Sequence, residues 1–307
     1  MSPSQERAPE MPGSTGRETV GEALRWGAER LARAGIEAPR REARLLLARA
    51  LGRSVEWVLA HPEGELGDLP DYGDLVRRRE DREPVSHILG EREFWSLPFR
   101  VGRDVLDPRP DSETLVELAL AQFPACDRPL RVLDLGVGSG CLLLSFLSER
   151  PLAFGVGVDL SPAALAVARE NARALGLEKR CAFMCGDWAD SLSGSFDLIL
   201  ANPPYIPEGE IDGLAPEVAR FEPRTALAGG PDGLDCYRAL APGIAALIAP
   251  RGKAIVEFGI GQAEAVGGIF EGAGMTLGDN RSDLSGRPRC LLLAAGAAQW
   301  LQKKPLE

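Results

Sequence analysis

The sequence lacks the features of a secreted or membrane protein. No stretch reaches the ~18–20 consecutive apolar residues that a membrane-spanning helix requires, and the N-terminus has no apolar signal core. We therefore expect no membrane partner and a cytoplasmic location for the chain.

Patterns typical of metal sites are also missing. The six cysteines are scattered without a C-x-x-C pair, and the nearest two, Cys181 and Cys185, have no histidine close by. The two histidines, His61 and His87, lie far from any set of cysteines or carboxylates at ligand spacing. The sequence predicts no metal site, and no covalent nucleophile or general base near neutrality is evident.

Basic charge is scarce. The chain has 35 Lys and Arg against 45 Asp and Glu, for a formal net charge of -10. Because phosphate contacts need clustered basic residues, this balance argues against a broad duplex-DNA binder, and we expect no stable nucleic-acid binding. The same charge balance is compatible with an acidic enzyme that binds a basic protein or a ribonucleoprotein.

The chain is long enough for a catalytic domain and a smaller one. Its 307 residues include 45% hydrophobic and 26% charged residues, as in ordinary globular proteins. Helical signals, among them a Thr19–Glu22 capping box and a helix between Pro39 and Gly52, dominate the first eighty residues. We predict a disordered leader (1–18), a helical docking domain (19–84), a β-hairpin linker (85–108), a catalytic domain (109–295) and a tail (296–307).

Strands and helices alternate through the predicted catalytic domain. Apolar strands are expected near residues 131–135, 153–158, 181–184, 196–201, 252–258 and 289–294, with helical segments between them. This order predicts the α/β class, with a mostly parallel sheet covered by helices on both faces.

A glycine-rich turn follows the first of these strands. Asp134 precedes Gly136, Gly138 and Gly140, and Asp159 ends the next strand at the distance from which an acidic side chain binds a ribose. The turn lacks the Gly-x-Gly-x-x-Gly spacing of dinucleotide sites, and a carboxylate beside it repels phosphate but attracts a sulfonium. These charges favour S-adenosylmethionine. A purely structural role for the glycines remains the alternative.

Asn202-Pro203-Pro204-Tyr205 follows the apolar run 196–201, where a parallel strand reaches the carboxyl edge of its sheet. Ligands of open α/β sheets bind outside that edge. The two prolines stiffen the loop and remove two donors, Asn202 adds an acceptor, and Tyr205 adds an aromatic face. Such an array suits a planar –NH2 group. The alternative is a polar turn that only ends a strand.

With these motifs, the chain resembles the class I methyltransferases that act on planar nitrogens. It is most similar to the HemK/PrmC family, the N5-glutamine methyltransferases of peptide chain release factors. The resemblance spans about residues 19–294 and rests on Gly-Glu-Arg-Glu-Phe-Trp (90–95), Asp-Pro-Arg-Pro-Asp-Ser-Glu (107–113), Asn-Pro-Pro-Tyr, and the stretch 221–234 that begins Phe-Glu-Pro-Arg-Thr. Asp107, Ser112 and Val137 depart from the residues usual in the family.

The resemblance implies a Rossmann-like catalytic domain, S-adenosylmethionine as cofactor, S-adenosylhomocysteine as product, and release factors as protein substrate. It also implies that the helical module engages the factor, and we expect a monomer. Ribosomal-protein glutamine methyltransferases, nucleic-acid amino (N6-adenine) methyltransferases and a non-catalytic binding protein remain alternatives.

The predicted site has a cofactor part and a substrate part. Asn202, Pro203 and Tyr205 are the expected catalytic residues, because two carbonyl oxygens there would accept the two protons of a glutamine amide. Pro204, Arg109 and Glu113 join them as substrate-binding residues, the last two by resemblance. The expected cofactor residues are Asp134, Gly136, Val137, Gly138, Gly140, Asp159, Leu160, Asp187, Trp188 and Asn202.

Overall fold

The computed structural model describes residues 18–67, 69–125, 127–190, 192–283 and 285–296. The chain forms two compact units, residues 1–89 and 90–307. Residues 1–17 of the expected leader (1–18) and residues 297–307 of the expected tail (296–307) lie outside the described residues. No helix among the described residues is both long and apolar enough to cross a membrane.

The first unit is a small helical bundle with one short strand pair. It contains β1 (Glu18–Thr19), α1 (Val20–Arg33), α2 (Pro39–Leu51), α3 (Val55–Ala60), β2 (Glu65–Leu66), α4 (Pro70–Glu80) and α5 (Val85–Leu89). The capping box is confirmed: the Glu22 N–H donates to Thr19 Oγ1, and the Glu22 carboxylate accepts from the Thr19 N–H. Leu31, Leu46 and Leu47 are fully buried in its core.

The second unit is built on a seven-stranded sheet. Its strands are β5 (Arg131–Leu135), β6 (Phe154–Asp159), β7 (Cys181–Cys185), β8 (Phe196–Ala201), β9 (Ile248–Glu257), β10 (Met275–Ser282) and β11 (Pro288–Ala295), in the order β10-β11-β9-β8-β5-β6-β7. The pairs from β7 to β9 are parallel, and β11 is antiparallel to both of its neighbours. The predicted, mostly parallel sheet is therefore confirmed.

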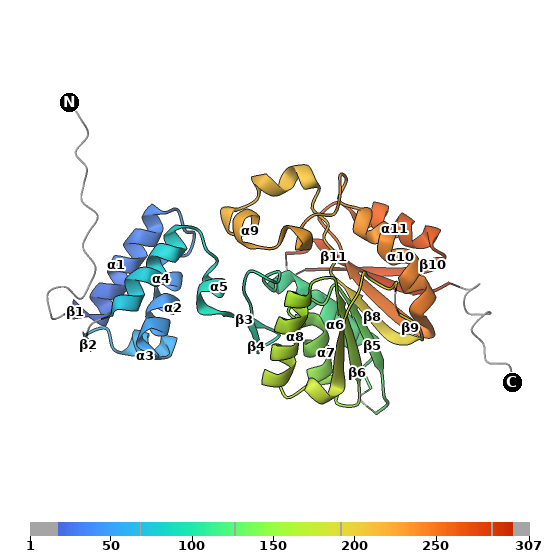
Figure 1. Cartoon of the computed structure of the whole chain (residues 1–307), viewed down its shortest axis with the longest axis horizontal. Helices are drawn as coiled ribbons and strands as arrows, with labels where there is room; N and C mark the ends of the chain where they lie inside the picture. The colour runs from blue at the N-terminus through green and yellow to red at the C-terminus, as the bar shows by residue number, and fades with distance from the viewer. Residues whose placement is uncertain (1–17, 68, 126, 191, 284, 297–307) are drawn as a thin grey trace. The chain divides into compact units, whose positions relative to one another are not determined.

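Helices cover both faces of this sheet (Figure 1). The core on one face includes residues of α6 (Glu113–Gln122), α7 (Cys141–Glu149) and α8 (Pro162–Ala174), and the other core includes α10 (Asp235–Leu247) and α11 (Ala263–Gly272). Neighbouring strand residues alternate between the two: Leu198 faces the first core and Ile199 the second, because successive side chains of a strand point to opposite faces. Shorter elements are η1 (Pro110–Ser112), η2 (Glu178–Arg180), η3 (Glu208–Gly213), α9 (Pro216–Phe221) and η4 (Arg224–Ala226).

The expected linker 85–108 is not a separate segment. Residues 85–89 form α5, and Ile88 is buried in the core of the first unit. The hairpin of β3 (Glu91–Phe94) and β4 (Leu97–Arg100) belongs to the second unit, where Phe94 and Phe99 are buried in the core beside α6 to α8. The division falls between residues 89 and 90 because apolar side chains on each side pack into different cores.

Asn171 joins the hairpin to the glycine-rich turn. Its side chain on α8 is fully buried, its Oδ1 accepts from the Arg100 N–H at 2.7 Å, and its Nδ2 donates to the carbonyls of Arg100 and Ser139 at 3.1 and 2.8 Å. One side chain thus satisfies main-chain groups of the last residue of β4 and of the glycine-rich turn.

We expect Asn171→Ala to lower the free energy of unfolding by about 2–4 kcal/mol, because it leaves buried main-chain groups without partners. Denaturant unfolding measures the loss. The control is Asn280→Ala, at an exposed position of β10, which should change stability by less than about 0.5 kcal/mol. Equal effects of the two substitutions would contradict the structural role of Asn171.

Candidate active site

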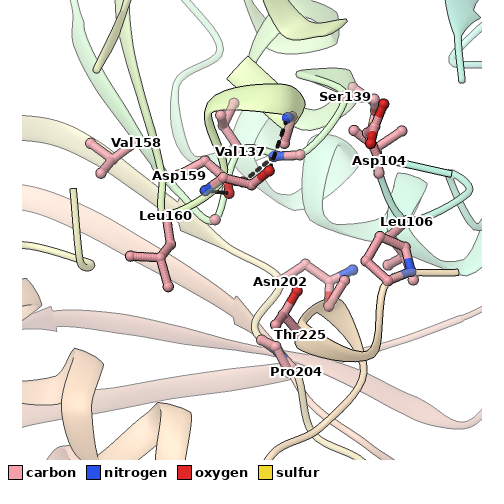
Figure 2. A pocket seen from close by; sticks show the side chains of 18 of the residues that line it. Asp104, Leu106, Val137, Ser139, Val158, Asp159, Leu160, Asn202, Pro204 and Thr225 are labelled. Carbon is pink, nitrogen blue, oxygen red and sulfur yellow. Dashed lines mark hydrogen bonds between the residues drawn. The ribbon is translucent and has the colours of Figure 1, made fainter. Parts of the chain in front are cut away.

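The main cavity of the second unit lies at the carboxyl ends of its parallel strands. It has a volume of about 680 Å³, within the range of small-molecule sites. The turn after β5 and the ends of β6, β7 and β8 form one part of its wall, and residues 103–112 and 223–228 form another. Figure 2 shows Asp159 and Leu160 across the cavity from Asn202 and Pro204.

The glycine-rich turn is shaped by its backbone. Gly136 has a φ of 78°, and a Cβ on it would lie 3.3 Å from the Trp188 ring, so glycine fits here for both conformation and space. The N–H groups of Gly136 and Val137 both donate to the Val158 carbonyl at 2.9 Å. These bonds hold the turn against the end of β6.

Asp159 is fixed by two main-chain donors. The Gly138 N–H donates to Oδ2 and the Ser161 N–H to Oδ1, both at 2.9 Å. A carboxylate offers about four acceptor positions, so two remain for a ligand. Asp159 lines the cavity, and this geometry suits recognition of a diol.

Asp134 lies behind the turn rather than on the cavity wall. It is 1% exposed, and neither carboxyl oxygen makes a hydrogen bond of ordinary geometry among the described residues. Burial raises the pKa of Asp134 to about 7. A buried carboxylate favours positive charge nearby, so the surroundings of this turn fit a cationic group and disfavour a phosphate.

The predicted cofactor residues converge on the cavity with two exceptions. Asp134 and Gly140 are outside its lining; Gly140 precedes α7 with a φ of 83°. The lining contains Gly136, Val137, Gly138, Asp159, Leu160, Asp187, Trp188 and Asn202. Leu160 is 65% exposed, which leaves its apolar side chain available to a flat, apolar ring.

A second cavity of about 200 Å³ adjoins the loop after β8. Asn202, Pro203, Pro204 and Tyr205 all line it. A Cβ on Gly259 would lie 3.0 Å from the Tyr205 ring, so that ring rests against the backbone there. Burial raises the pKa of Tyr205 to about 12, which keeps the phenol neutral. The remaining lining is mostly apolar: Leu106, Arg109, Ile206, Leu214, Val218, Ala226 and Leu227.

Arg109 and Glu113 have different surroundings. Arg109 lines both cavities, and its Nη2 lies 2.7 Å from both carboxyl oxygens of Glu222. Burial raises the pKa of Glu222 to about 7, against the opposite effect of Arg109. Glu113 lines neither cavity. Its carboxylate accepts from the Trp95 N–H at 2.8 Å and so supports the hairpin turn.

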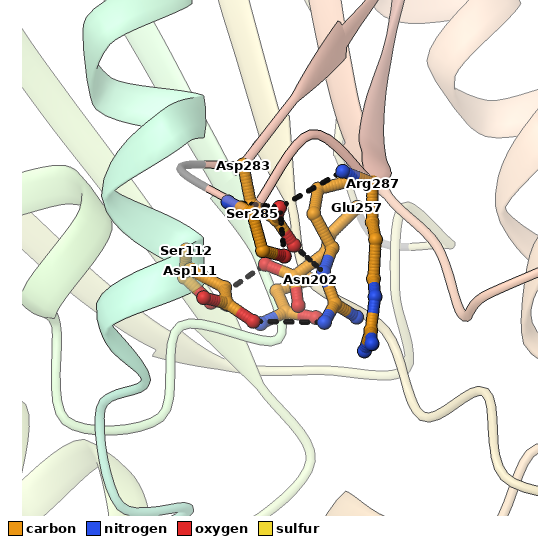
Figure 3. A network of polar contacts seen from close by, with 8 residues as sticks. Asp111, Ser112, Asn202, Glu257, Asp283, Ser285 and Arg287 are labelled. Atoms are coloured by element: carbon orange, nitrogen blue, oxygen red, sulfur yellow. Dashed lines mark hydrogen bonds and ion pairs between the residues drawn. The ribbon is translucent and has the colours of Figure 1, made fainter.

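Sequence reasoning missed two buried carboxylates near the site. Glu222 holds Arg109, and Glu257 bonds Ser112 beside Asn202 (Figure 3). Glu222 lies within the stretch 221–234, one of the motifs that carry the family resemblance, but Glu257 ends an apolar strand with no local signal of its role. A charged residue closing such a strand, at the functional edge of a parallel sheet, was the available hint.

The described residues can be compared with the arrangements that hold a metal ion or a reactive thiol. No group of three or more His, Cys, Asp or Glu residues there is arranged to hold a metal ion. Cys141 and Cys236 line the main cavity, and burial raises the pKa of both thiols, that of Cys141 to about 12. Neither is a thiolate near neutral pH.

Comparison with known proteins agrees with this geometry. The PrmC N-terminal domain matches residues 22–90, and the Methyltransferase small domain matches residues 110–217. Among solved structures, the hMettl16 catalytic domain in complex with MAT2A 3'UTR hairpin 6 has a TM-score of 0.53 at 12% identity, over 72% of this chain and 82% of that one. That likeness concerns the fold alone. The predicted Rossmann-like methyltransferase fold is thereby confirmed.

Two bacterial relatives are much more similar. The release factor glutamine methyltransferase of Rhodospirillum rubrum is 52% identical over 91% of this chain and 86% of its own length. The enzyme of the same name from Caulobacter vibrioides is 47% identical over 86% of this chain and 92% of its own length. Because relatives this similar span most of both chains, the chain belongs to the release factor glutamine methyltransferase family.

Proposed function

We propose that the chain transfers a methyl group from S-adenosylmethionine to the side-chain amide nitrogen of a glutamine, the one in the Gly-Gly-Gln motif of peptide chain release factors. The observation that carries this proposal is the Asn202–Tyr205 loop, which borders both the large cavity and the small one. Family membership supports the substrate class.

The residues around the larger cavity fit this cofactor. We assign the free acceptor positions of Asp159 to the ribose hydroxyls, and Leu160 and Trp188 to the faces of the base. The buried Asp134 carboxylate behind the turn favours a positive charge in front of it. When bound, S-adenosylmethionine supplies an electrophilic methyl group on a positively charged sulfur.

The loop after β8 would orient the methyl acceptor. An amide nitrogen is a poor nucleophile because its lone pair is delocalised, so placement and electrostatics must carry the catalysis. Asn202 Oδ1 and the Pro203 carbonyl would each accept one amide proton, and the Tyr205 ring would pack against the amide plane. The nitrogen would form the new N–C bond as the bond between the methyl group and sulfur breaks. S-adenosylhomocysteine would be the leaving group, and the nitrogen would lose one proton to solvent. Arg109, held by Glu222, would border the entry.

The helical first unit is proposed to dock the release factor, in line with its match to the PrmC N-terminal domain. If the helical unit binds parts of the factor outside its Gly-Gly-Gln motif, an intact factor should be a far better substrate than a short Gly-Gly-Gln peptide. Monomeric state, cytoplasmic location and the absence of stable nucleic-acid binding belong to the same proposal. Size-exclusion chromatography with light scattering measures the first of these.

Methyl transfer from labelled S-adenosylmethionine tests the function. The acceptors are a purified release factor, the same factor with the glutamine of Gly-Gly-Gln changed to alanine, a short Gly-Gly-Gln peptide, and a mixture of tRNA and DNA. We expect label on the intact factor, none on the altered factor or the nucleic acids, and a much lower kcat/KM for the peptide.

Two outcomes would change the proposal. Label on nucleic acid would replace a protein substrate with an exocyclic amino group. An equal kcat/KM for peptide and factor would remove the docking role from the helical unit.

Asn202→Ala should lower kcat by roughly 10²–10³-fold, because it removes an acceptor that fixes and polarises the amide. Cofactor affinity should change by less than about threefold, since Asp159 and the glycine-rich turn are untouched. Steady-state kinetics and calorimetric titration of the cofactor separate the two effects. A normal kcat would exclude Asn202 from the reaction.

Asp159→Ala should weaken cofactor binding by roughly 10- to 100-fold, because charge-assisted hydrogen bonds to the ribose are lost. The matched control is Asp190→Ala, which makes the same change of charge at an exposed position outside the cavity lining. Calorimetric titration gives both affinities. If the two variants bind equally well, the ribose contact lies elsewhere.

A further inference from the structure

A series of hydrogen-bonded polar side chains links the loop that follows β8 to η1 and β9 (Figure 3). Asn202 Nδ2 donates to Ser112 Oγ at 3.2 Å, and the Ser112 hydroxyl donates to Glu257 Oε2 at 2.6 Å. Ser112 is 3% exposed and Glu257 is 2% exposed. The three residues come from η1, from the end of β8 and from the end of β9, so only the folded chain brings them together.

The Ser112 hydroxyl determines which groups donate and which accept in these two hydrogen bonds. A serine hydroxyl has one hydrogen to donate, and here the Glu257 carboxylate takes it. The Ser112 oxygen can then only accept, so the side chain of Asn202 must turn its nitrogen toward Ser112. The amide oxygen of Asn202 therefore faces away from Ser112.

We propose that Ser112 and Glu257 are positioning residues that hold the Asn202 amide with its oxygen toward the methyl acceptor. This inference rests on the proposed function, in which Asn202 Oδ1 accepts a proton of the substrate amide. If the Asn202 amide were inverted, its NH2 group would face the NH2 group of the substrate amide. Donors would then face donors, and the substrate nitrogen would lose its orientation.

Arg289 on β11 is the main cation near Glu257. Its Nη2 contacts Asp111 and its Nε contacts Asp283, each at 2.8 Å. Asp283 is itself held by hydrogen bonds from Ser285 and from the Arg287 N–H, which keep its pKa below the usual range. The titratable or charged groups that interact with Glu257 are Arg289 and Cys290 of β11, Asp111 of η1, Tyr205 after β8, Tyr237 of α10 and Cys141 of α7.

The donor-to-acceptor direction of these hydrogen bonds depends on the charge of Glu257. Burial raises the pKa of Glu257 to about 7, while the Ser112 hydrogen bond, the charge of Arg289 and a side-chain hydrogen bond from Asn202 oppose that rise. Above this pH the carboxylate accepts from Ser112 and Asn202 keeps its productive orientation. Below this pH the protonated Glu257 carboxyl can donate to the Ser112 oxygen. The Ser112 hydrogen is then free to be donated to Asn202 Oδ1, and the preferred orientation of the Asn202 amide inverts.

A substrate-free measurement tests this arrangement. The chain has three asparagines, Asn171, Asn202 and Asn280, so labelling asparagine side chains with ¹⁵N leaves three amide pairs to follow by NMR, and Asn202→Ala identifies its own. We expect the Asn202 pair to shift with a midpoint near pH 7, and Ser112→Ala to reduce that shift, because one of the two links to Glu257 is then lost. Asn171, whose amide donates to main-chain carbonyls, is the internal control. An Asn202 signal indifferent to pH and to Ser112→Ala would overturn the proposal.

Kinetics give an independent test. Ser112→Ala should lower kcat/KM for the release factor by roughly 10- to 100-fold with unchanged cofactor affinity, and Ser112→Thr should recover most of the loss because it keeps the hydroxyl. In an Asn202→Ala background, Ser112→Ala should cost nothing further, since it acts through Asn202. Equal losses in both backgrounds would overturn the positioning role. Failure of the wild-type chain to label the factor would instead reject the proposed function, and the NMR titration would still decide the orientation of Asn202.

Discussion

The reversal of strand order beside β5 is the constraint on which the site depends. The chain proceeds outward from β5 to β6 and β7, then returns to β8 on the other side of β5. The connections on the two sides therefore leave a crevice at the carboxyl edge of the sheet. The glycine-rich turn and Asn202 follow strands of this buried sheet, and Asp159 is the last residue of one. Their positions are held by the strand ladder, which suits a reaction that relies on placement.

Buried polar groups complete the walls of the crevice. Asn171 ties the hairpin to the glycine-rich turn, and the pair of Arg109 and Glu222 joins the loop before η1 to the segment after β8. Such groups require partners, because an unpaired polar atom in the interior is costly. They therefore specify where irregular loops lie, a task that apolar packing performs for the helices and strands.

Local signals in the sequence anticipated much of the fold. The capping box of Thr19, the glycine-rich turn and the strand before Asn202 were predictable because each depends on neighbouring residues alone. The edge strand β10 was not anticipated, since only Met275 is buried in it and most of its other side chains are exposed. The five-residue helix α5 was too short for a periodic pattern, and it extends the first unit to residue 89, so the division between the two units falls inside the expected linker.

The chemistry available to this chain could be read from its amino-acid order: a stiff loop of acceptors, a turn open to close backbone approach, and acidic residues at strand ends. Which of these groups meet depends on the folded structure. Ser112 lies 90 residues from Asn202 and 145 from Glu257 along the chain, yet the three are hydrogen-bonded in one buried cluster. It also separated Glu113 from Arg109, although the two are close in sequence. Short-range patterns encode backbone conformation, whereas the meeting of distant side chains depends on how strands and helices pack.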